Sequence, residues 1–220
     1  MIAPYPASAL LPLAELRPRY HTEHPAPWVR ALATALARSG QVNVRVLVDS
    51  RAVTRRHEVR ADEVTYVFVP KREPIRTDPL HGYIPGAIRI ARELRADPPD
   101  LVIGFGVEGG CARLAIRQAY PSVVFIQGII EKTSEFRDIL PFRLRAYLRD
   151  ERRALFDADA LVAETTFARD WARGHNPRCM IALIPHAMDT AFLENRPTYR
   201  EPIALCIGSL NRIKDPETVL

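Results

Sequence analysis

Short apolar runs alternate along the chain with segments in which apolar residues recur at helical spacing. Trp28, Leu32 and Leu36 stand four residues apart behind Pro27, which predicts a helix over residues 27–39 that ends at Gly40. The same patterns predict helices at 83–95, 108–119, 136–156 and 167–173, and strands at 1–3, 42–48, 64–69, 101–103, 123–126, 160–163 and 181–184. Because strands and helices alternate across short connections, we expect parallel βαβ units and a doubly wound, mainly parallel, Rossmann-like α/β sheet.

The last twenty residues have the pattern of another unit of the same kind. Residues 203–207 are an apolar run, residues 208–214 are a glycine-led loop, and residues 215–217 carry the Asp, Pro and Glu of a helix start. A polar, proline-bounded stretch at 197–202 is typical of an interdomain linker. We therefore expect a first domain at 1–196, a linker at 197–202, and the start of an incomplete second Rossmann-like domain at 203–220.

The composition is that of an ordinary soluble globular protein, because 47% of the residues are apolar and 26% are charged. It excludes a disordered, fibrous or membrane-spanning chain. The net charge of +5 leaves open a surface for phosphates, anionic lipid or an acidic glycan. The apolar stretch at 2–16 follows no basic residue and is interrupted by prolines, so it differs from a secretory signal and we expect a cytoplasmic protein. The three cysteines show no paired spacing and are expected to be buried thiols: Cys111, Cys179 and Cys206.

One glycine-rich segment satisfies the G-x-G-x-x-G pattern of dinucleotide-binding proteins. It runs from Gly104 to Gly110 between a predicted strand and a predicted helix, where backbone amides can meet a phosphate. Dinucleotide sites also need an acidic residue at the end of the next strand, and that strand ends here at Gln127 and Gly128. The pattern therefore favours a tight turn lining the cleft at the carboxyl edge of the sheet, with NAD binding as the alternative.

A histidine pair and a basic helix are the other candidate features. His21 and His24 are three residues apart in a proline-flanked loop without a third ligand, so no metal site is expected. His24 precedes the first helix, at the edge where ligands of α/β sheets bind, which makes it a candidate substrate contact. The helix predicted at 136–156 has leucines on one side and arginines around them. That pattern suits a core-packed helix with a solvated face, or one that touches an anionic membrane.

Six segments carry motifs in a fixed order along the chain. They are residues 28–48, 99–104 (PDLVIG), 124–128 (VFIQG), 158–165 (ADALVAET), 184–189 (IPHAMD) and 207–214 (IGSLNRIK). Together they resemble retaining, nucleotide-sugar-dependent glycosyltransferases of family 4. The resemblance implies the GT-B fold, in which two Rossmann-like domains face each other across a cleft. It also implies that the first domain recognises the acceptor and the second binds the nucleotide sugar.

On the acceptor side, we expect the cleft to be lined by His24, Gly106, Glu108 and Gln127. The family often has a glycine pair before the first helix, where this chain has Pro25 and Pro27 around Ala26, and proline offers no amide hydrogen to a ligand. A histidine frequent in the family is replaced by Gln127, which can hydrogen-bond a sugar hydroxyl without acting as an acid or base.

On the donor side, the resemblance implies that the glycine-led loop binds the diphosphate through fixed positive charge. The residues concerned are Gly208, Ser209, Arg212 and Lys214. Lys214 matches the lysine of the family, whereas Ser209 stands at the arginine position and Arg212 is the substitute. The paired glutamates of the family fall beyond Leu220, so we expect these 220 residues alone to be inactive.

The sequence therefore predicts a glycosyltransferase that moves a sugar from a nucleotide donor to a lipid-linked or polysaccharide acceptor with retention. The nucleotide sugar is a substrate, so neither a cofactor nor a metal is expected, and no nucleic acid. The predicted location is the cytoplasm, or the inner face of the membrane through the basic helix at 136–156. The alternatives are a non-catalytic ligand-binding or assembly domain, and another α/β nucleotide enzyme such as an NAD-dependent enzyme or a GT-B-type sugar epimerase.

Overall fold

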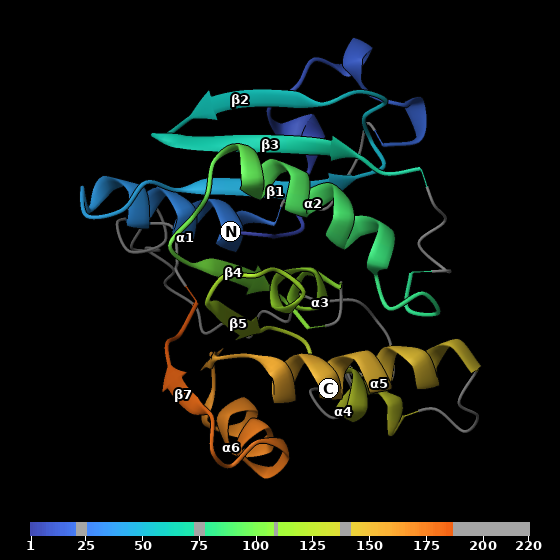
Figure 1. The fold of residues 1–220 in the computed structure, drawn as a ribbon, viewed down its shortest axis with the longest axis vertical. Helices are drawn as coiled ribbons and strands as arrows, with labels where there is room; N and C mark the ends of the chain where they lie inside the picture. Colours follow the sequence, from blue (N-terminus) through green and yellow to red (C-terminus); the bar gives the residue numbers. More distant parts are fainter. Residues whose placement is uncertain (21–25, 73–77, 108–109, 137–141, 187–220) are drawn as a thin grey trace, which may run out of the picture.

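The computed structural model describes residues 1–20, 26–72, 78–107, 110–136 and 142–186. Within these residues, seven strands form a twisted sheet flanked by helices (Figure 1). One part has the order β1-β3-β2, and the other has the order β4-β5-β6-β7. All pairs are parallel except β2 with β3. The strands are β1 (Arg45–Ser50), β2 (His57–Ala61), β3 (Val64–Pro70), β4 (Val102–Phe105), β5 (Ser122–Ile126), β6 (Ala160–Ala163) and β7 (Met180–Leu183).

Ile2 joins the two parts of the sheet. It makes parallel bridges to Leu47 of β1 and to Gly104 of β4. Its amide donates to the Ile103 carbonyl at 2.7 Å, and the Phe105 amide donates to the Ile2 carbonyl at 2.9 Å. The strand predicted at 1–3 is therefore reduced to this single bridging residue. From Ile2, the strands β1 and β3 follow one another toward one edge of the sheet, and β4 to β7 follow one another toward the opposite edge. Ile2 therefore marks the switch point of a doubly wound sheet.

Most predicted helices are confirmed, with shifted ends. The helices are α1 (Pro27–Arg38), α2 (Ile84–Ala96), α3 (Cys111–Ile116), α4 (Ile130–Ser134), α5 (Phe142–Asp157) and α6 (Thr166–His175). Three short 3-10 turns, Ala7–Ala9, Leu13–Glu15 and Pro18–Tyr20, lie in the segment before α1. The helix predicted at 108–119 is shorter because Gly110 has φ +82°, a left-handed conformation that stands before the first helical residue.

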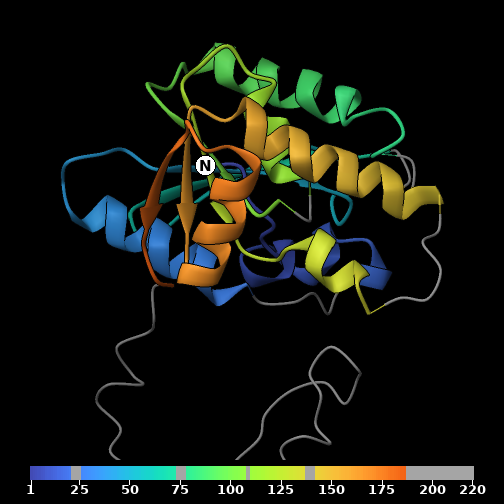
Figure 2. The ribbon, with the colours of Figure 1, turned by 90° about the horizontal axis from the view of Figure 1, so that it is seen from below.

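Successive residues of a strand point to opposite faces of the sheet and pack into two different layers of the core. On one face, Val46 and Val48 of β1 join Val29 and Ala33 of α1. On the other face, Leu47 packs with the residues of α2 and α3, and a third cluster extends over β5 and β6 to α5 and α6. Figure 2 shows α2 and α1 on opposite sides of the sheet. The two-residue period of the strands thus determines which helix each side chain contacts.

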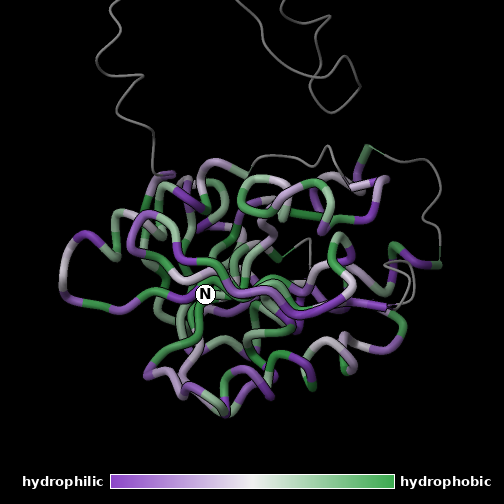
Figure 3. Tube along the Cα trace, turned by 90° about the horizontal axis from the view of Figure 1, so that it is seen from above, coloured by the Kyte–Doolittle hydropathy of each residue, from purple (hydrophilic) through white to green (hydrophobic). Residues whose placement is uncertain are grey.

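Two elements were not predicted. Strand β2 contains His57, Glu58 and Arg60, and it is the antiparallel edge strand next to β3. Figure 3, viewed from that edge, shows mostly hydrophilic colouring along it. The short helix α4 precedes α5, and the buried Glu151 of α5 accepts hydrogen bonds from the amides of Ile130 and Glu131 at 2.6 and 2.9 Å. The helix predicted at 136–156 therefore corresponds to α5, which begins at Phe142, and α4 is an additional helix before the predicted range.

Helix α5 packs into the core with its apolar side. Leu155 and Ala154 are fully buried, whereas Arg152 and Arg153 are exposed. The buried Arg113 of α3 forms an ion pair with Asp150 of α5, 3.7 Å apart. Burial lowers the pKa of Arg113 and raises the pKa of Asp150. Within the described part of the chain, no helix has both the length and the apolar character needed to span a bilayer.

The cysteines differ from one another. Cys111 is buried in the α2–α3 layer, as predicted, but Cys179, which directly precedes β7, is only half-buried. Burial raises the pKa of the Cys179 thiol. Cys206 lies outside the described residues.

Candidate functional site

A small pocket of about 110 Å³ lies at the carboxyl edge of the sheet, where ligands of open α/β folds bind. Each strand from β4 to β7 contributes a residue at or just beyond its carboxyl end, and α1 contributes its first turns. The lining residues are Trp28, Leu32, Phe105, Phe125, Glu164, Ile184, Pro185 and His186. The pocket therefore combines six apolar or aromatic side chains with one carboxylate and one imidazole.

Its floor is aromatic. Phe105 and Phe125 are directly opposite each other in the β4–β5 pairing, and their rings stack with centroids 5.1 Å apart. Trp28 and Leu32 are four residues apart in α1, so both project from the same side of the helix. The Trp28 ring lies 5.9 Å from the His186 ring, at an angle of 39°.

The polar end of the pocket is formed by Glu164 and His186, which contact each other. The Nε2 atom of His186 lies 2.6 Å from a carboxylate oxygen of Glu164, which immediately follows β6. The Glu164 side chain is 12% exposed and that of His186 is 44% exposed, so the carboxylate is largely buried whereas the imidazole reaches solvent. Partial burial lowers the pKa of His186 below its usual value. A neutral imidazole is therefore favoured at neutral pH, with Nε2–H donating to the carboxylate.

The glycine-rich segment has a packing role. A Cβ atom on Gly104 would lie 2.8 Å from the Cα atom of Ala112 and 2.8 Å from the Cβ atom of Ala115, so α3 could not approach β4 as closely. Gly106 has φ +94° and donates its amide to the Phe125 carbonyl at 3.0 Å. A Cβ atom on Gly110 would lie 2.1 Å from the Tyr83 ring. These contacts support the tight-turn interpretation of the segment.

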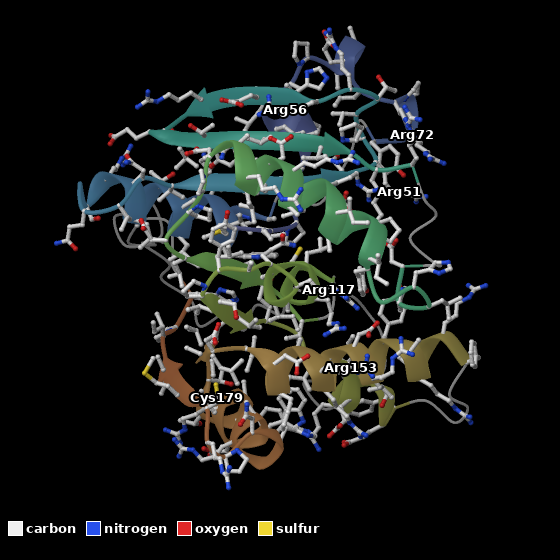
Figure 4. The ribbon with its side chains drawn as sticks, in the orientation of Figure 1. Arg51, Arg56, Arg72, Arg117, Arg153 and Cys179 are labelled. Carbon is white, nitrogen blue, oxygen red and sulfur yellow. The ribbon has the colours of Figure 1, made fainter. Side chains whose placement is uncertain are left out.

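A positively charged section of the same edge follows β1 and β3. Arg51 comes after β1 and Arg72 after β3, and Figure 4 shows both near the ends of those strands. Lys71, between them, is buried and pairs with Asp78 and with Asp49, 3.4 Å from the latter. Because its charge is neutralised by two carboxylates, Lys71 positions the loop rather than a ligand. Arg51 and Arg72 therefore supply the positive charge of this section.

Two of the predicted acceptor-side residues lie at this edge. Gly106 directly follows the pocket residue Phe105, and the half-buried Gln127 follows β5 two residues after Phe125. His24 and Glu108 lie outside the described residues, as do the predicted donor-side residues Gly208, Ser209, Arg212 and Lys214.

The pocket residues Trp28, Glu164 and His186 were not predicted as site residues. Trp28 stands at the start of a predicted helix, whereas Glu164 and His186 follow predicted strands, and parallel strands bring their carboxyl ends to one edge. That rule could have found Glu164 and His186, although it does not by itself choose among the residues of a loop. No group of three or more His, Cys, Asp or Glu residues suited to a metal ion occurs in the part of the chain that the structure describes.

A conformational feature explains how α1 begins without the glycines of the family pattern. Ala26 adopts φ +43° and ψ +53°, the left-handed conformation that glycine adopts most easily. Pro27 then occupies the first helical position. The chain thus keeps a glycine-like turn before Trp28 despite its prolines.

Comparisons with known proteins identify the family of the chain. No curated protein gives a significant match to the sequence. A solved structure of trehalose-6-phosphate synthase, from work on enzymatic glycosyl transfer with retention, matches with 12% identity and a TM-score of 0.39. The match covers 69% of this chain and 40% of that one, so this chain spans well under half of that structure. The family model Glycosyltransferase Family 4 matches residues 27–192, from the first residue of α1 to beyond the pocket residue His186. The chain belongs to glycosyltransferase family 4.

Proposed function

We propose that this chain is the acceptor-binding part of an enzyme that transfers a sugar from a nucleotide donor to a lipid-linked or polysaccharide acceptor with retention. The family match over residues 27–192 carries this proposal, because it includes α1 to α6 and the strands β4 to β7 that end at the pocket. Residues 1–196 form the acceptor domain in this proposal, residues 197–202 the linker, and residues 203–220 the start of the donor domain.

The positively charged residues suggest which part of the chain binds the donor and which part binds the acceptor. Arg212 and Lys214, with the backbone of Gly208 and Ser209, bind the donor diphosphate and stabilise the departing nucleotide without a metal. Arg51 and Arg72 suit the phosphate of a lipid-linked acceptor, because arginine forms paired hydrogen bonds with phosphate oxygens. Gln127 and Gly106 contact the acceptor near the reacting hydroxyl, with His24 and Glu108 nearby.

Calorimetric titration of the full-length protein tests this function. The ligands are UDP-glucose, UDP-N-acetylglucosamine, GDP-mannose and NAD. We expect one of the nucleotide sugars to bind and NAD to give no heat of binding. Binding of NAD alone would establish the alternative nucleotide enzyme, and a folded protein that binds none of the four would favour the non-catalytic assembly domain.

The role of Gln127 has a matched control. Gln127→Ala should lower turnover in the full-length enzyme, because a hydrogen bond to the acceptor is lost at the reacting end. Gln41→Ala changes an exposed glutamine after α1, outside the pocket, and should leave turnover unchanged. Wild-type kinetics for both variants would remove Gln127 from the site.

Peripheral membrane contact is a second, separate proposal for the enzyme at the inner face of the membrane. Phe142 at the start of α5 is 74% exposed, and the exposed Arg143 and Arg145 follow it. An exposed aromatic ring flanked by arginines can insert at an anionic headgroup layer. Vesicles containing phosphatidylglycerol should retain the protein in flotation, and Phe142→Ser should release it. Equal flotation of both proteins would contradict this contact.

A further inference from the structure

We propose that the pocket between Trp28, Glu164 and His186 binds one neutral pyranose ring of the acceptor. The C–H face of the sugar lies against the indole of Trp28, and its hydroxyls bond to the carboxylate and the imidazole. This inference rests on the proposed function, since it assigns part of the acceptor to a defined place.

The chemistry of the walls matches a pyranose. A sugar ring has an apolar face of C–H bonds and a rim of hydroxyls, so it needs an aromatic surface beside strong polar groups. Trp28 supplies the amphipathic surface, with Phe105 and Phe125 behind it. Glu164 supplies carboxylate oxygens that accept from hydroxyls, and His186 supplies a ring nitrogen opposite the one that faces Glu164.

The polar groups are held in position before a ligand arrives. The 2.6 Å contact fixes the Glu164 carboxylate and the His186 imidazole relative to each other. The ring contact with Trp28 then places the imidazole beside the aromatic surface. Hydrogen bonds to a charged carboxylate are stronger than those between neutral groups, and little rotamer freedom is lost when the ligand binds.

Charge and size select the ligand class. A phosphate would meet the negative charge of Glu164, so the pocket disfavours a nucleotide diphosphate or a phosphorylated sugar. The positive section of the edge, at Arg51 and Arg72, is separate from the pocket lining. A cavity of about 110 Å³ accommodates a single small ring rather than a chain of sugars. A neutral sugar unit therefore fits better than an anion or a long glycan.

Fluorine NMR on protein labelled with 5-fluorotryptophan tests the proposal, because the chain has only two tryptophans. Trp28 lines the pocket, whereas the Trp171 indole donates to Glu131 at 3.2 Å and serves as an internal control. Methyl glycosides of glucose, galactose, mannose and N-acetylglucosamine are titrated separately. We expect at least one to shift the Trp28 signal saturably without moving the Trp171 signal, and Trp28→Phe assigns the signals.

Glu164→Gln should weaken this binding about tenfold, since a carboxylate acceptor is replaced by a neutral amide. The undisturbed Trp171 signal reports that the variant is folded. Movement of neither signal with any of the four glycosides, or equal movement of both, would overturn the proposal.

Failure of the pyranose-binding proposal can be distinguished from failure of the proposed transferase function. Glycoside binding at Trp28 in a full-length protein that consumes no nucleotide sugar would leave the pocket assigned and overturn the transferase. Sugar transfer by a Glu164→Gln enzyme with an unchanged KM for the acceptor would support the transferase and overturn the assignment of the pocket.

Discussion

The substitution Gly110→Ala tests why the glycine-rich segment requires glycine. We expect the reason to be packing and backbone conformation rather than a bound phosphate. Gly110 stands before α3 with φ +82°, and an added Cβ atom would lie 2.1 Å from Cε1 of Tyr83 and 2.6 Å from Cζ. Two separate costs therefore act at this position. One is the left-handed backbone, and the other is the collision with a buried ring.

Three other glycines separate these costs. Gly40 has φ +68° and open space around it, so alanine there meets the backbone cost alone. Gly104 has no left-handed backbone, but its Cβ atom would meet the backbone of Ala112 at 2.8 Å, so alanine meets the collision alone. Gly174 in α6 has neither feature and is the matched control.

The expected magnitudes follow from this division. Gly174→Ala should stabilise the protein by roughly 0.5 kcal/mol, because alanine restricts the unfolded chain and favours the helix. Gly40→Ala should destabilise by about 1 kcal/mol, the cost of left-handed backbone at a residue with a Cβ atom. Gly104→Ala should destabilise by about 1–3 kcal/mol through overpacking. Gly110→Ala combines both costs and should lose roughly 2–5 kcal/mol.

Urea unfolding followed by circular dichroism measures all four variants, with the slope against urea checked for constancy. If the values for Gly110→Ala and Gly40→Ala differ by less than about 0.5 kcal/mol, the range of an ordinary surface substitution, the collision with Tyr83 is refuted. If Gly104 and Gly110 instead served a phosphate, alanine at either would abolish nucleotide binding while stability stayed near that of the wild type.

Three further predictions concern the helices beside the sheet. Burial alone would raise the pKa of Glu131, but the hydrogen bonds from Arg152 and Trp171 outweigh it. The pKa therefore lies below its usual value of 4.5. The wild type should therefore have a higher free energy of unfolding than Glu131→Gln, with the full difference above pH 4.5. This difference should vanish as the pH falls through the lower pKa of the folded state, and a difference that stays constant with pH in urea unfolding would contradict this. Glu151→Ala should cost roughly 2–4 kcal/mol in urea, because two backbone amides of α4 lose a buried carboxylate; a loss below about 1 kcal/mol would disprove that role. Thr165→Ala should cost about 1 kcal/mol because Thr165 caps α6, whereas Thr166→Ala should cost less; equal losses would rule out the cap.

The parts of the fold that could be predicted are those with apolar patterns of their own. β4, β5 and β6 lie in the middle of the sheet with both faces covered, so their sequences are continuous apolar runs. β2 could not be predicted because a polar edge strand gains its structure by pairing with β3. α4 could not be predicted because its start depends on Glu151, about twenty residues later in the chain.

The site divides in the same way. Gly106 and Gln127 could be placed at the carboxyl edge because each follows a clear strand. Trp28, Glu164 and His186 belong to three distant segments, and only the order of the strands brings them together. Their sequence neighbourhoods contain family motifs, but a motif does not reveal that an imidazole in one segment pairs with a carboxylate in another.

Product analysis by NMR tests the central claim most directly. The full-length protein is incubated with ¹³C-labelled UDP-glucose, UDP-N-acetylglucosamine or GDP-mannose, together with the methyl glycosides used for the pocket. The account predicts that one labelled sugar appears on a methyl glycoside with the anomeric configuration that it had in the donor. Transfer with inversion would contradict retention, and intact donor in every mixture would contradict the transferase itself.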